Sequence, residues 1–177
     1  VKIIQKCLAL QKKMKILLIG SSSDIARNLV DNSNPQFEFI ELTSTPTLTN
    51  QHQIDVQNEE SYPHIEGEVN GIVYFPGSIN LRPFSSLKLS DFQKDYEINV
   101  LGLIKTLKHY HKQLSTDSSV VLISSVAASL GMPYHASISM CKAAIEGLCR
   151  SLAAEWSPKV RVNCIAPSVV QTKLSSR

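Results

Sequence analysis

The sequence predicts an α/β protein with a doubly wound parallel sheet, arranged as three α/β/α layers. Short apolar runs rich in β-branched residues recur along the chain, as in buried parallel strands. Helical stretches with one apolar or small-residue face follow several of these runs. We expect six strands, at residues 15–19, 37–42, 53–56, 71–75, 120–123 and 160–166.

Length and composition restrict the classes of function. A chain of 177 residues can form one domain with a substantial core. The formal net charge of +3 is small and the basic residues are scattered, so we expect no nucleic-acid partner. No apolar run is long enough to cross a bilayer, and we expect no membrane association. The cysteines lack metal-ligand spacing, which indicates no metal site and favours reduced thiols in a cytoplasmic protein: Cys7, Cys141, Cys149 and Cys164.

The first convincing strand begins near Met14. Residues 1–13 are basic, contain no acidic residue and are mildly amphipathic. An organelle-targeting segment is one interpretation, but the segment lacks the arginine and serine richness of such signals. We favour an extension outside the fold, with a single domain at 14–177.

A turn of one glycine and three serines, residues 20–23, follows the first strand. A helix at 24–32 comes next, with Ser22 or Ser23 as its cap and with Ile25 and Leu29 expected to face inward. Free N–H groups and the helix dipole make such a turn an anion site, and serine hydroxyls add donors for phosphate.

The turn matches the dinucleotide-binding fingerprint only in part. Gly20 is present, but Asp24 and Ala26 stand where the other two glycines would be. Thr43 and Ser44 follow the second strand, where an acid would bind the ribose hydroxyls and favour NAD. Because Glu41 is close, the choice between NAD and NADP stays open, with a slight preference for NADP.

A central strand at 120–123 ends in Ser124 and Ser125. Ligands in open α/β sheets bind beyond the carboxyl ends of strands, so these hydroxyls are candidates for chemistry, although they could simply begin a loop. The helix that follows carries Lys142 one turn from its start. Its apolar face comprises Ile138, Cys141, Ile145, Leu148, Leu152 and Trp156. Small residues form another face, and a mid-helix Gly147 suggests close packing: Ala144, Gly147, Ser151 and Ala154.

An earlier helical stretch begins near Ser90 and carries Asn99. Asparagine is mildly unfavourable inside a helix, so we expect its side chain to form a hydrogen bond. The apolar stripe of this stretch comprises Val100, Leu103, Ile104, Leu107, Tyr110 and Leu114.

Taken together and in order, these motifs resemble the short-chain dehydrogenase/reductase family over residues 14–177. The matching segments are Gly20 to Ala26, Asp55-Val56, Phe75-Pro76-Gly77 where the family has Asn-Ala-Gly, Asn99-Val100, Ile123-Ser124-Ser125, Lys142-Ala143-Ala144, Asn163 to Pro167, and Thr172. The resemblance implies a Rossmann-like fold and an NAD(P)-dependent oxidoreductase that moves a hydride to or from a carbonyl, alcohol or activated alkene.

The resemblance also implies roles for individual residues. Ser125 would orient a substrate carbonyl, Asn99 would hold a water linked to Lys142, and Lys142 would contact the nicotinamide ribose. Contacts with NADP or NAD would come from Gly20, Ser22, Ser23, Ile25, Asp55, Val56, Gly77, Lys142, Pro167, Val170 and Thr172.

One departure from the family concerns the proton donor. The family's tyrosine lies four residues before its lysine, and that position is Ile138 here. In the related enoyl-reductase branch the tyrosine lies seven residues before the lysine, where this chain has His135. An imidazole exchanges protons near neutral pH, so His135 is a candidate catalytic acid, unless it merely bonds the backbone. Tyr134, one residue away, is the other candidate.

The second departure is that family members continue beyond the position of Arg177, with a segment that covers the substrate and a seventh strand. The resemblance therefore implies a chain truncated before that strand, either a fragment or a protein without a substrate lid. It also implies a small-molecule substrate and a homo-oligomer formed through the two long helices. A non-catalytic dinucleotide-binding or sensor protein, or an inactive truncated copy, is the alternative function.

Overall fold

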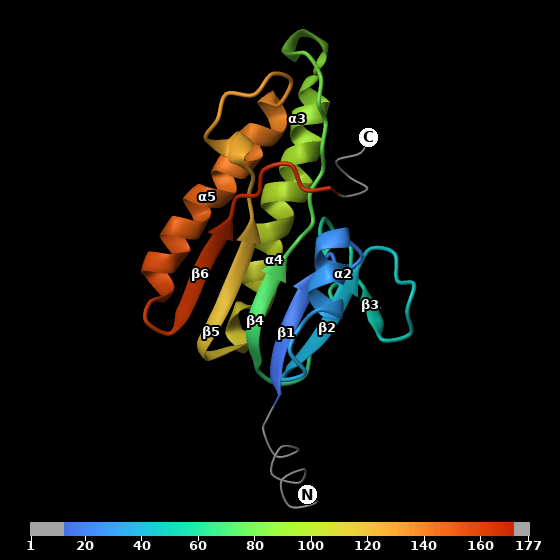
Figure 1. Ribbon diagram of the computed structural model, residues 1–177, viewed down its shortest axis with the longest axis vertical. Helices are drawn as coiled ribbons and strands as arrows, with labels where there is room; N and C mark the ends of the chain where they lie inside the picture. The colour runs from blue at the N-terminus through green and yellow to red at the C-terminus, as the bar shows by residue number, and fades with distance from the viewer. Residues whose placement is uncertain (1–12, 172–177) are drawn as a thin grey trace, which may run out of the picture.

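The computed structural model describes residues 13–171, in which six strands form one parallel sheet of order β3-β2-β1-β4-β5-β6 (Figure 1). The strands are β1 (Met14–Ile19), β2 (Phe37–Thr43), β3 (Gln51–Gln53), β4 (Val69–Tyr74), β5 (Leu114–Ile123) and β6 (Val160–Ile165). The chain builds the sheet outward from β1 to β3, then returns to add β4 on the other side of β1. This reversal confirms the doubly wound class, and it makes the carboxyl ends of β1 and β4 the switch point at which ligands bind.

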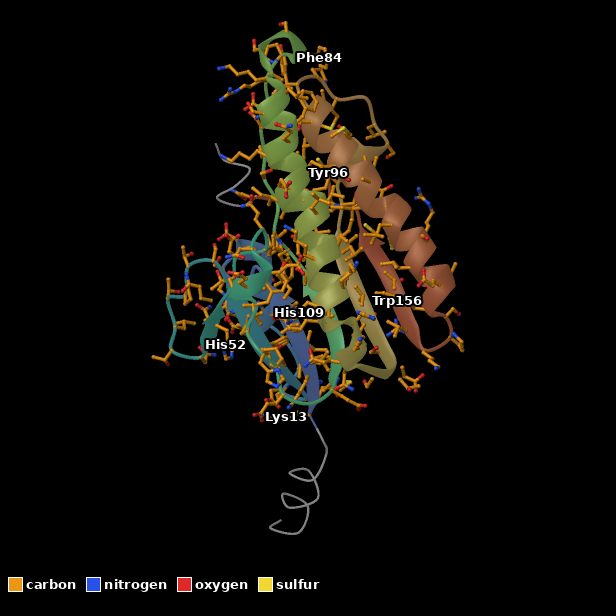
Figure 2. The ribbon with its side chains drawn as sticks, turned by 180° about the vertical axis from the view of Figure 1, so that it is seen from behind. Lys13, His52, Phe84, Tyr96, His109 and Trp156 are labelled. Carbon is orange, nitrogen blue, oxygen red and sulfur yellow. The ribbon has the colours of Figure 1, made fainter. Side chains whose placement is uncertain are left out.

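The helices cover the two faces of the sheet unequally. They are α2 (Asp24–Asp31), α3 (Leu89–Tyr96), a π-helical turn (Glu97–Leu101), α4 (Gly102–Tyr110) and α5 (Ala136–Trp156). Helices α4 and α5 lie side by side over one face (Figure 2). Right-handed crossovers place α2, which follows β1, over the opposite face (Figure 1).

The core lies between the sheet and α4 and α5. Side chains from β4, β5 and β6 that point toward these helices are buried, whereas Val73, Val121 and Ile165 on the opposite face are partly or largely exposed. The largest fully buried side chains include Tyr74, Tyr110, Leu17, Ile19, Leu42, Ile72, Leu103, Leu122 and Ile145.

The predicted bounds of β3 were wrong. The strand ends at Gln53, and residues 54–56, which we expected to continue it, leave the sheet. The backbone N of Ile54 still donates to Thr43 O at 3.0 Å, an ordinary hydrogen-bond length. The Oδ1 atom of Asp55 then accepts from the backbone N of Gln57 at 2.9 Å. This local turn competes with the ladder of the sheet and ends the strand.

The predicted inward face of α2 was also wrong. Ile25 and Leu29 are 37% and 39% exposed, whereas Ala26 is fully buried. The helix contacts the sheet through Ala26 and Arg27, and the guanidinium of Arg27 forms an ion pair with Glu41 of β2 at 2.7 Å. This ion pair holds the helix in a rotation about its axis that buries Ala26, where the apolar pattern suggested that Ile25 would be buried.

Helix α5 packs as its apolar pattern predicts. Ile138, Cys141 and Ile145 are buried, and its later apolar residues are half-buried or buried. Gly147 behaves differently from expectation, because a Cβ built there meets no atom within 4 Å in the described part of the chain. Within one chain, Gly147 therefore has no packing requirement.

Candidate active site

A cleft of about 870 Å³ lies at the carboxyl ends of the strands. Its walls come from the loops that follow β1, β2, β3, β4, β5 and β6, together with the first turns of α2 and α5. The expected cofactor residues within the described chain all line this cleft: Gly20, Ser22, Ser23, Ile25, Asp55, Val56, Gly77, Lys142, Pro167 and Val170. Thr172 lies outside the described residues.

The turn after β1 has the geometry of an anion site. Gly20 has φ +78°, a left-handed conformation that favours glycine, and a Cβ there would lie 3.0 Å from Pro76 Cδ. The Ser23 hydroxyl caps α2 by accepting from Ala26 N at 3.2 Å. The hydroxyl of Ser22 accepts from Thr43 Oγ1 at 2.9 Å, so the turn is tied to the end of β2. The prediction of Ser22 or Ser23 as the cap is resolved in favour of Ser23.

The acid near the end of β2 does not face the cleft. Glu41 is 3% exposed, and its Oε2 contacts both Arg27 and the amide of Gln51, the latter at 2.8 Å. Thr43 and Ser44 line the cleft at this point instead. The wall beside the expected ribose position therefore carries hydroxyls and no carboxylate from β2.

Lys142 is the buried cation of the cleft. Only 9% of the residue is exposed, and its Nζ donates to the carbonyl oxygen of Ile123, the last residue of β5, at 2.9 Å. Burial lowers the pKa of the Lys142 ammonium to about 8. A backbone acceptor thus holds the Lys142 side chain at the carboxyl end of β5.

Asn99 lies directly behind the loop that follows β4. Its Nδ2 donates to Asp95 O at 2.8 Å and to Ser78 Oγ at 3.0 Å, which confirms the expected side-chain hydrogen bond. Its Oδ1 is buried and has no hydrogen-bond partner among the described residues. A Cβ built on Gly77 would lie 3.1 Å from this Oδ1 and 3.5 Å from Lys142 Nζ. Because Gly77 has no side chain, Asn99 Oδ1 and Lys142 Nζ can both lie close to its Cα.

The two serines at the end of β5 have different environments. Ser124 is buried, and its hydroxyl donates to Glu146 Oε1 at 2.7 Å, so it joins the strand to α5. The hydroxyl of Ser125 accepts from Ala127 N at 3.2 Å and lines the cleft. Because Ser125 only accepts in that bond, its own hydrogen can be donated to a ligand.

Three residues bear on the question of the proton donor. Ile138 is 4% exposed and forms part of the cleft wall one helical turn before Lys142. His135 lines the same cleft, with its Nδ1 2.6 Å from Pro133 O, so Nδ1 carries the hydrogen and Nε2 is the other available nitrogen. Tyr134 is 59% exposed, has φ +68° and is not among the residues that line the cleft.

The sequence did not reveal a buried carboxylate next to this site. Asp95 of α3 is 2% exposed, and its Oδ1 accepts from Ser78 Oγ at 2.5 Å while its Oδ2 accepts from Ser137 Oγ at 2.7 Å. We call Asp95, Ser78, Ser137 and Asn99 the Asp95 network. The spacing of Asp95 and Asn99, four residues apart on one helical face, was the available signal, but the two serines come from distant segments.

The described part of the chain contains neither a candidate metal site nor a candidate membrane span. Among residues 13–171 there is no group of three or more His, Cys, Asp or Glu side chains that could hold a metal ion. No helix in this range is long and apolar enough to cross a membrane. Cys141, Cys149 and Cys164 are free, and burial raises the pKa of each thiol, to about 11 for Cys141.

Comparisons with known proteins agree with this fold. A family model described as enoyl-(acyl carrier protein) reductase matches residues 47–177. Hydroxynaphthalene reductase arp2 of Aspergillus fumigatus is 33% identical over 109 residues, which cover 61% of this chain and 40% of that protein. Tropinone reductase-like 3 of Erythroxylum coca is 41% identical over 86 residues, 49% of this chain and 33% of that protein. The matched part thus spans less than half the length of either relative.

A solved structure extends the match to nearly the whole chain. Ligand-free aldohexose dehydrogenase of Thermoplasma acidophilum has a TM-score of 0.80 and 23% identity, and the match covers 93% of this chain and 69% of that one. The fold is therefore a Rossmann-like, doubly wound α/β fold. The chain belongs to the short-chain dehydrogenase/reductase family.

Proposed function

We propose that the chain is an NAD(P)-dependent oxidoreductase that transfers a hydride to or from a carbonyl, alcohol or activated alkene. The observation that carries the proposal concerns Lys142 Nζ and the unpartnered Asn99 Oδ1. A Cβ built on Gly77 would lie 3.5 Å from the first and 3.1 Å from the second, and Gly77, Lys142 and Ser125 all line the cleft. A fold alone requires neither a buried ammonium nor an orphaned buried amide oxygen.

The cleft fits a nicotinamide dinucleotide. The turn at 20–23 and the N-terminus of α2 offer N–H donors and hydroxyls for a pyrophosphate, and Asp55 and Val56 form the wall for the adenine. Two solved relatives in fold, a small-chain dehydrogenase and ElxO, are described with NADPH and NADP bound, respectively. Bound in this cleft, the coenzyme would supply or accept the hydride.

The protein's own groups would handle orientation and the proton. Ser125 has a hydrogen to donate to a substrate oxygen, and Lys142 has further N–H groups besides the one bonded to Ile123 O, and these would contact the ribose. His135, with Nδ1 bonded to Pro133, would present Nε2 to the cleft as the proton donor in its charged form. We infer NADP rather than NAD, because Glu41 is occupied by Arg27 and hydroxyls line the ribose wall.

The test has two stages. Fluorescence titration with NADPH and NADH should show binding of both, with tighter binding of NADPH; binding of neither would refute the proposal. Stereospecific hydride exchange with a carbonyl panel should follow. His135→Ala should lower the rate about 10²–10⁴-fold with unchanged coenzyme affinity. The matched control is Tyr134→Phe, because Tyr134 lies outside the cleft lining and should leave the rate unchanged.

A second candidate function is non-catalytic coenzyme binding, as in a sensor or an inactive copy. The apolar side chain of Ile138 on the cleft wall favours it, since that position has no exchangeable proton. Coenzyme binding without hydride exchange on any carbonyl would select this alternative.

We also propose a homo-oligomer formed through α4 and α5. A groove of about 280 Å³ runs between these helices, and its lining is largely apolar: Ile104, Leu107, Leu148, Leu152 and Trp156, with Lys108, His111 and Glu155. Gly147 on the adjoining surface has open space around it. Light scattering should give a multiple of the chain mass, and Gly147→Arg should reduce it to a single chain. A wild-type chain that scatters as a monomer would reject the oligomer.

A further inference from the structure

Tyr74 holds a fixed place at the centre of the sheet. It is the last residue of β4, is 2% exposed, and pairs with Ile19 of β1 on one side and Leu122 of β5 on the other. Its hydroxyl donates to the carbonyl oxygen of Ile98 at 2.9 Å. A buried tyrosine usually pairs its hydroxyl, and here the acceptor belongs to the π-helical turn that carries Asn99.

The π-helical turn, Glu97–Leu101, changes which backbone groups pair. In an α-helix the N–H of Gly102 would donate to Ile98 O, four residues back. Here the N–H of Gly102 donates to Glu97 O, five residues back. The hydroxyl of Tyr74 therefore meets Ile98 O where an α-helix would offer a backbone donor. Burial raises the pKa of Tyr74 well above its ordinary value of 10.0, so the phenol keeps its hydrogen and stays a donor.

The bond to Ile98 O acts directly on Asn99. The carbonyl of Ile98 and the N–H of Asn99 belong to one planar peptide unit, so a fixed oxygen also fixes the plane from which the Asn99 side chain extends. The Nδ2 atom of that side chain donates two hydrogen bonds within the Asp95 network. Its Oδ1 lies beside Gly77, because a Cβ built there would be 3.1 Å away. Tyr74 thus supports the backbone that places Oδ1 at this point.

Gly102, the first residue of α4, leaves room for the phenol. A Cβ built on Gly102 would lie 2.8 Å from the Tyr74 hydroxyl and 3.0 Å from Val56 Cγ2. Glycine is a poor helix former, so close packing explains its presence here better than helix formation does. A side chain at this position would have to displace the phenol or Val56. The end of β4 and the start of α4 therefore fit each other through Tyr74 and Gly102.

We propose that Tyr74 is a positioning residue for the hydride transfer: its hydroxyl holds the Ile98–Asn99 peptide so that Asn99 Oδ1 stays beside Gly77, which Lys142 Nζ also approaches. This inference rests on the proposed oxidoreductase function, in which Asn99 and Lys142 act together. Tyr74 does not line the cleft, so it acts through Asn99 and not by contact with coenzyme or substrate.

The matched pair of variants is Tyr74→Phe and Tyr110→Phe. Tyr110 is also fully buried, and its hydroxyl donates to the carbonyl oxygen of Pro63 at 2.9 Å. Each variant therefore removes one buried phenol–carbonyl bond of the same length, and both should lose a similar amount of stability on urea unfolding. Tyr110 is the last residue of α4, so its loss should leave Asn99 undisturbed.

The first measurement is the environment of Asn99, read from the ¹⁵N NMR signals of its side-chain amide in the full chain. Asn99→Ala identifies these signals by their disappearance. Tyr74→Phe should shift or broaden them, and Tyr110→Phe should not. The second measurement is single-turnover hydride transfer with bound NADPH. Tyr74→Phe should slow this step about tenfold to 10²-fold with unchanged NADPH affinity, whereas Tyr110→Phe should match the wild type.

The third measurement tests whether Tyr74 acts through Asn99. In the Asn99→Ala background, Tyr74→Phe should cause no further loss of rate, because the group that it positions is gone. An equal loss in both backgrounds, unmoved Asn99 amide signals, or an unchanged rate in Tyr74→Phe overturns the positioning role. If the wild type binds no NADPH or transfers no hydride, the oxidoreductase proposal fails instead, and the NMR comparison still decides whether Tyr74 positions Asn99.

Discussion

The Nζ atom of Lys142 donates a hydrogen bond of 2.9 Å to the carbonyl oxygen of Ile123. This bond joins the second turn of α5 to the last residue of β5, two residues before Ser125. It gives the buried ammonium a backbone partner and holds it beside the strand end that carries the candidate catalytic hydroxyl. The remaining ammonium hydrogens are available to the cleft.

Burial of Lys142 predicts a pH-dependent stability. The folded pKa is about 8 and the ordinary value is 10.5, so the unfolded chain binds more protons between these pH values. Stability therefore rises with pH through this window, by about 3 kcal/mol from this group. Urea unfolding of the wild type and of Lys142→Met should differ in this way, with the variant lacking the rise.

The comparison with Lys142→Met is necessary because other groups titrate nearby. Burial raises the pKa of Cys141 from 9.0 to about 11, and a raised thiol pKa makes stability fall with increasing pH. Burial of Cys141 is common to both proteins, whereas the charge of Lys142 lowers the Cys141 pKa, so the difference between the proteins reports Lys142 together with its coupling to Cys141. A difference in unfolding free energy that stays constant from pH 7 to pH 11, taken as an approximate range around both pKa values, would contradict the burial of a charged Lys142.

Two glycines should respond to alanine in opposite directions. Gly20→Ala should cost about 1–2 kcal/mol and weaken coenzyme binding, because φ is +78° and the new Cβ would lie 3.0 Å from Pro76 Cδ. Gly147→Ala should raise the unfolding free energy by about 1 kcal/mol, since the residue is in mid-helix and the added Cβ meets nothing within 4 Å. Chemical denaturation and NADPH titration measure both effects. Equal effects of the two substitutions would show that the backbone conformation of Gly20 does not matter.

Some of this site follows from local sequence and some does not. The turn at 20–23, Ser125 and Lys142 each lie at the boundary of one strand and one helix, so their place at the carboxyl edge of the sheet follows from chain order. The Asp95 network joins α3, the loop after β4 and the start of α5, and no local pattern specifies that three-way contact.

Two of the errors in the fold have a similar origin. The apolar pattern of α2 suggested that Ile25 faces inward, but the ion pair between Arg27 and Glu41 sets the rotation of the helix. For β3, the sequence pattern placed the strand at residues 53–56, whereas the strand ends at Gln53 and the side chain of Asp55 supplies a turn. In both cases a polar contact overrode hydrophobic periodicity.

The hydroxyl-lined end of β2 predicts how coenzyme preference can be changed. Ser44 lines the cleft and is exposed, so Ser44→Asp would place a carboxylate where a phosphate on the ribose would lie. Repulsion should weaken NADPH binding at least about tenfold, while a carboxylate can bind the ribose hydroxyls of NADH. The ratio of the two dissociation constants measures the change, with Ser44→Asn as the uncharged control. A ratio shifted equally by Asp and Asn would show that charge is not the cause.

The position of Ile138 predicts a gain of activity. Ile138 is one turn before Lys142 on the cleft wall, so Ile138→Tyr would extend a phenol hydroxyl into the cleft near the ammonium. In the His135→Ala background, from which the proposed donor is removed, a general acid at this point should raise the rate of hydride exchange about 10²–10⁴-fold, and the nearby charge of Lys142 should favour the ionised phenol. Single-turnover rates with bound NADPH measure the gain.

The control for this gain is Ile138→Phe, which adds a ring of nearly the same size without a hydroxyl. If phenylalanine raises the rate as much as tyrosine does, packing of the cleft wall is responsible and the proton is supplied elsewhere. If neither variant accelerates exchange although both bind NADPH, Ser125, Asn99 and Lys142 do not form a working site. A gain confined to tyrosine means that these three groups are already arranged for catalysis and that a phenol at position 138 can take the place of His135 as the acid.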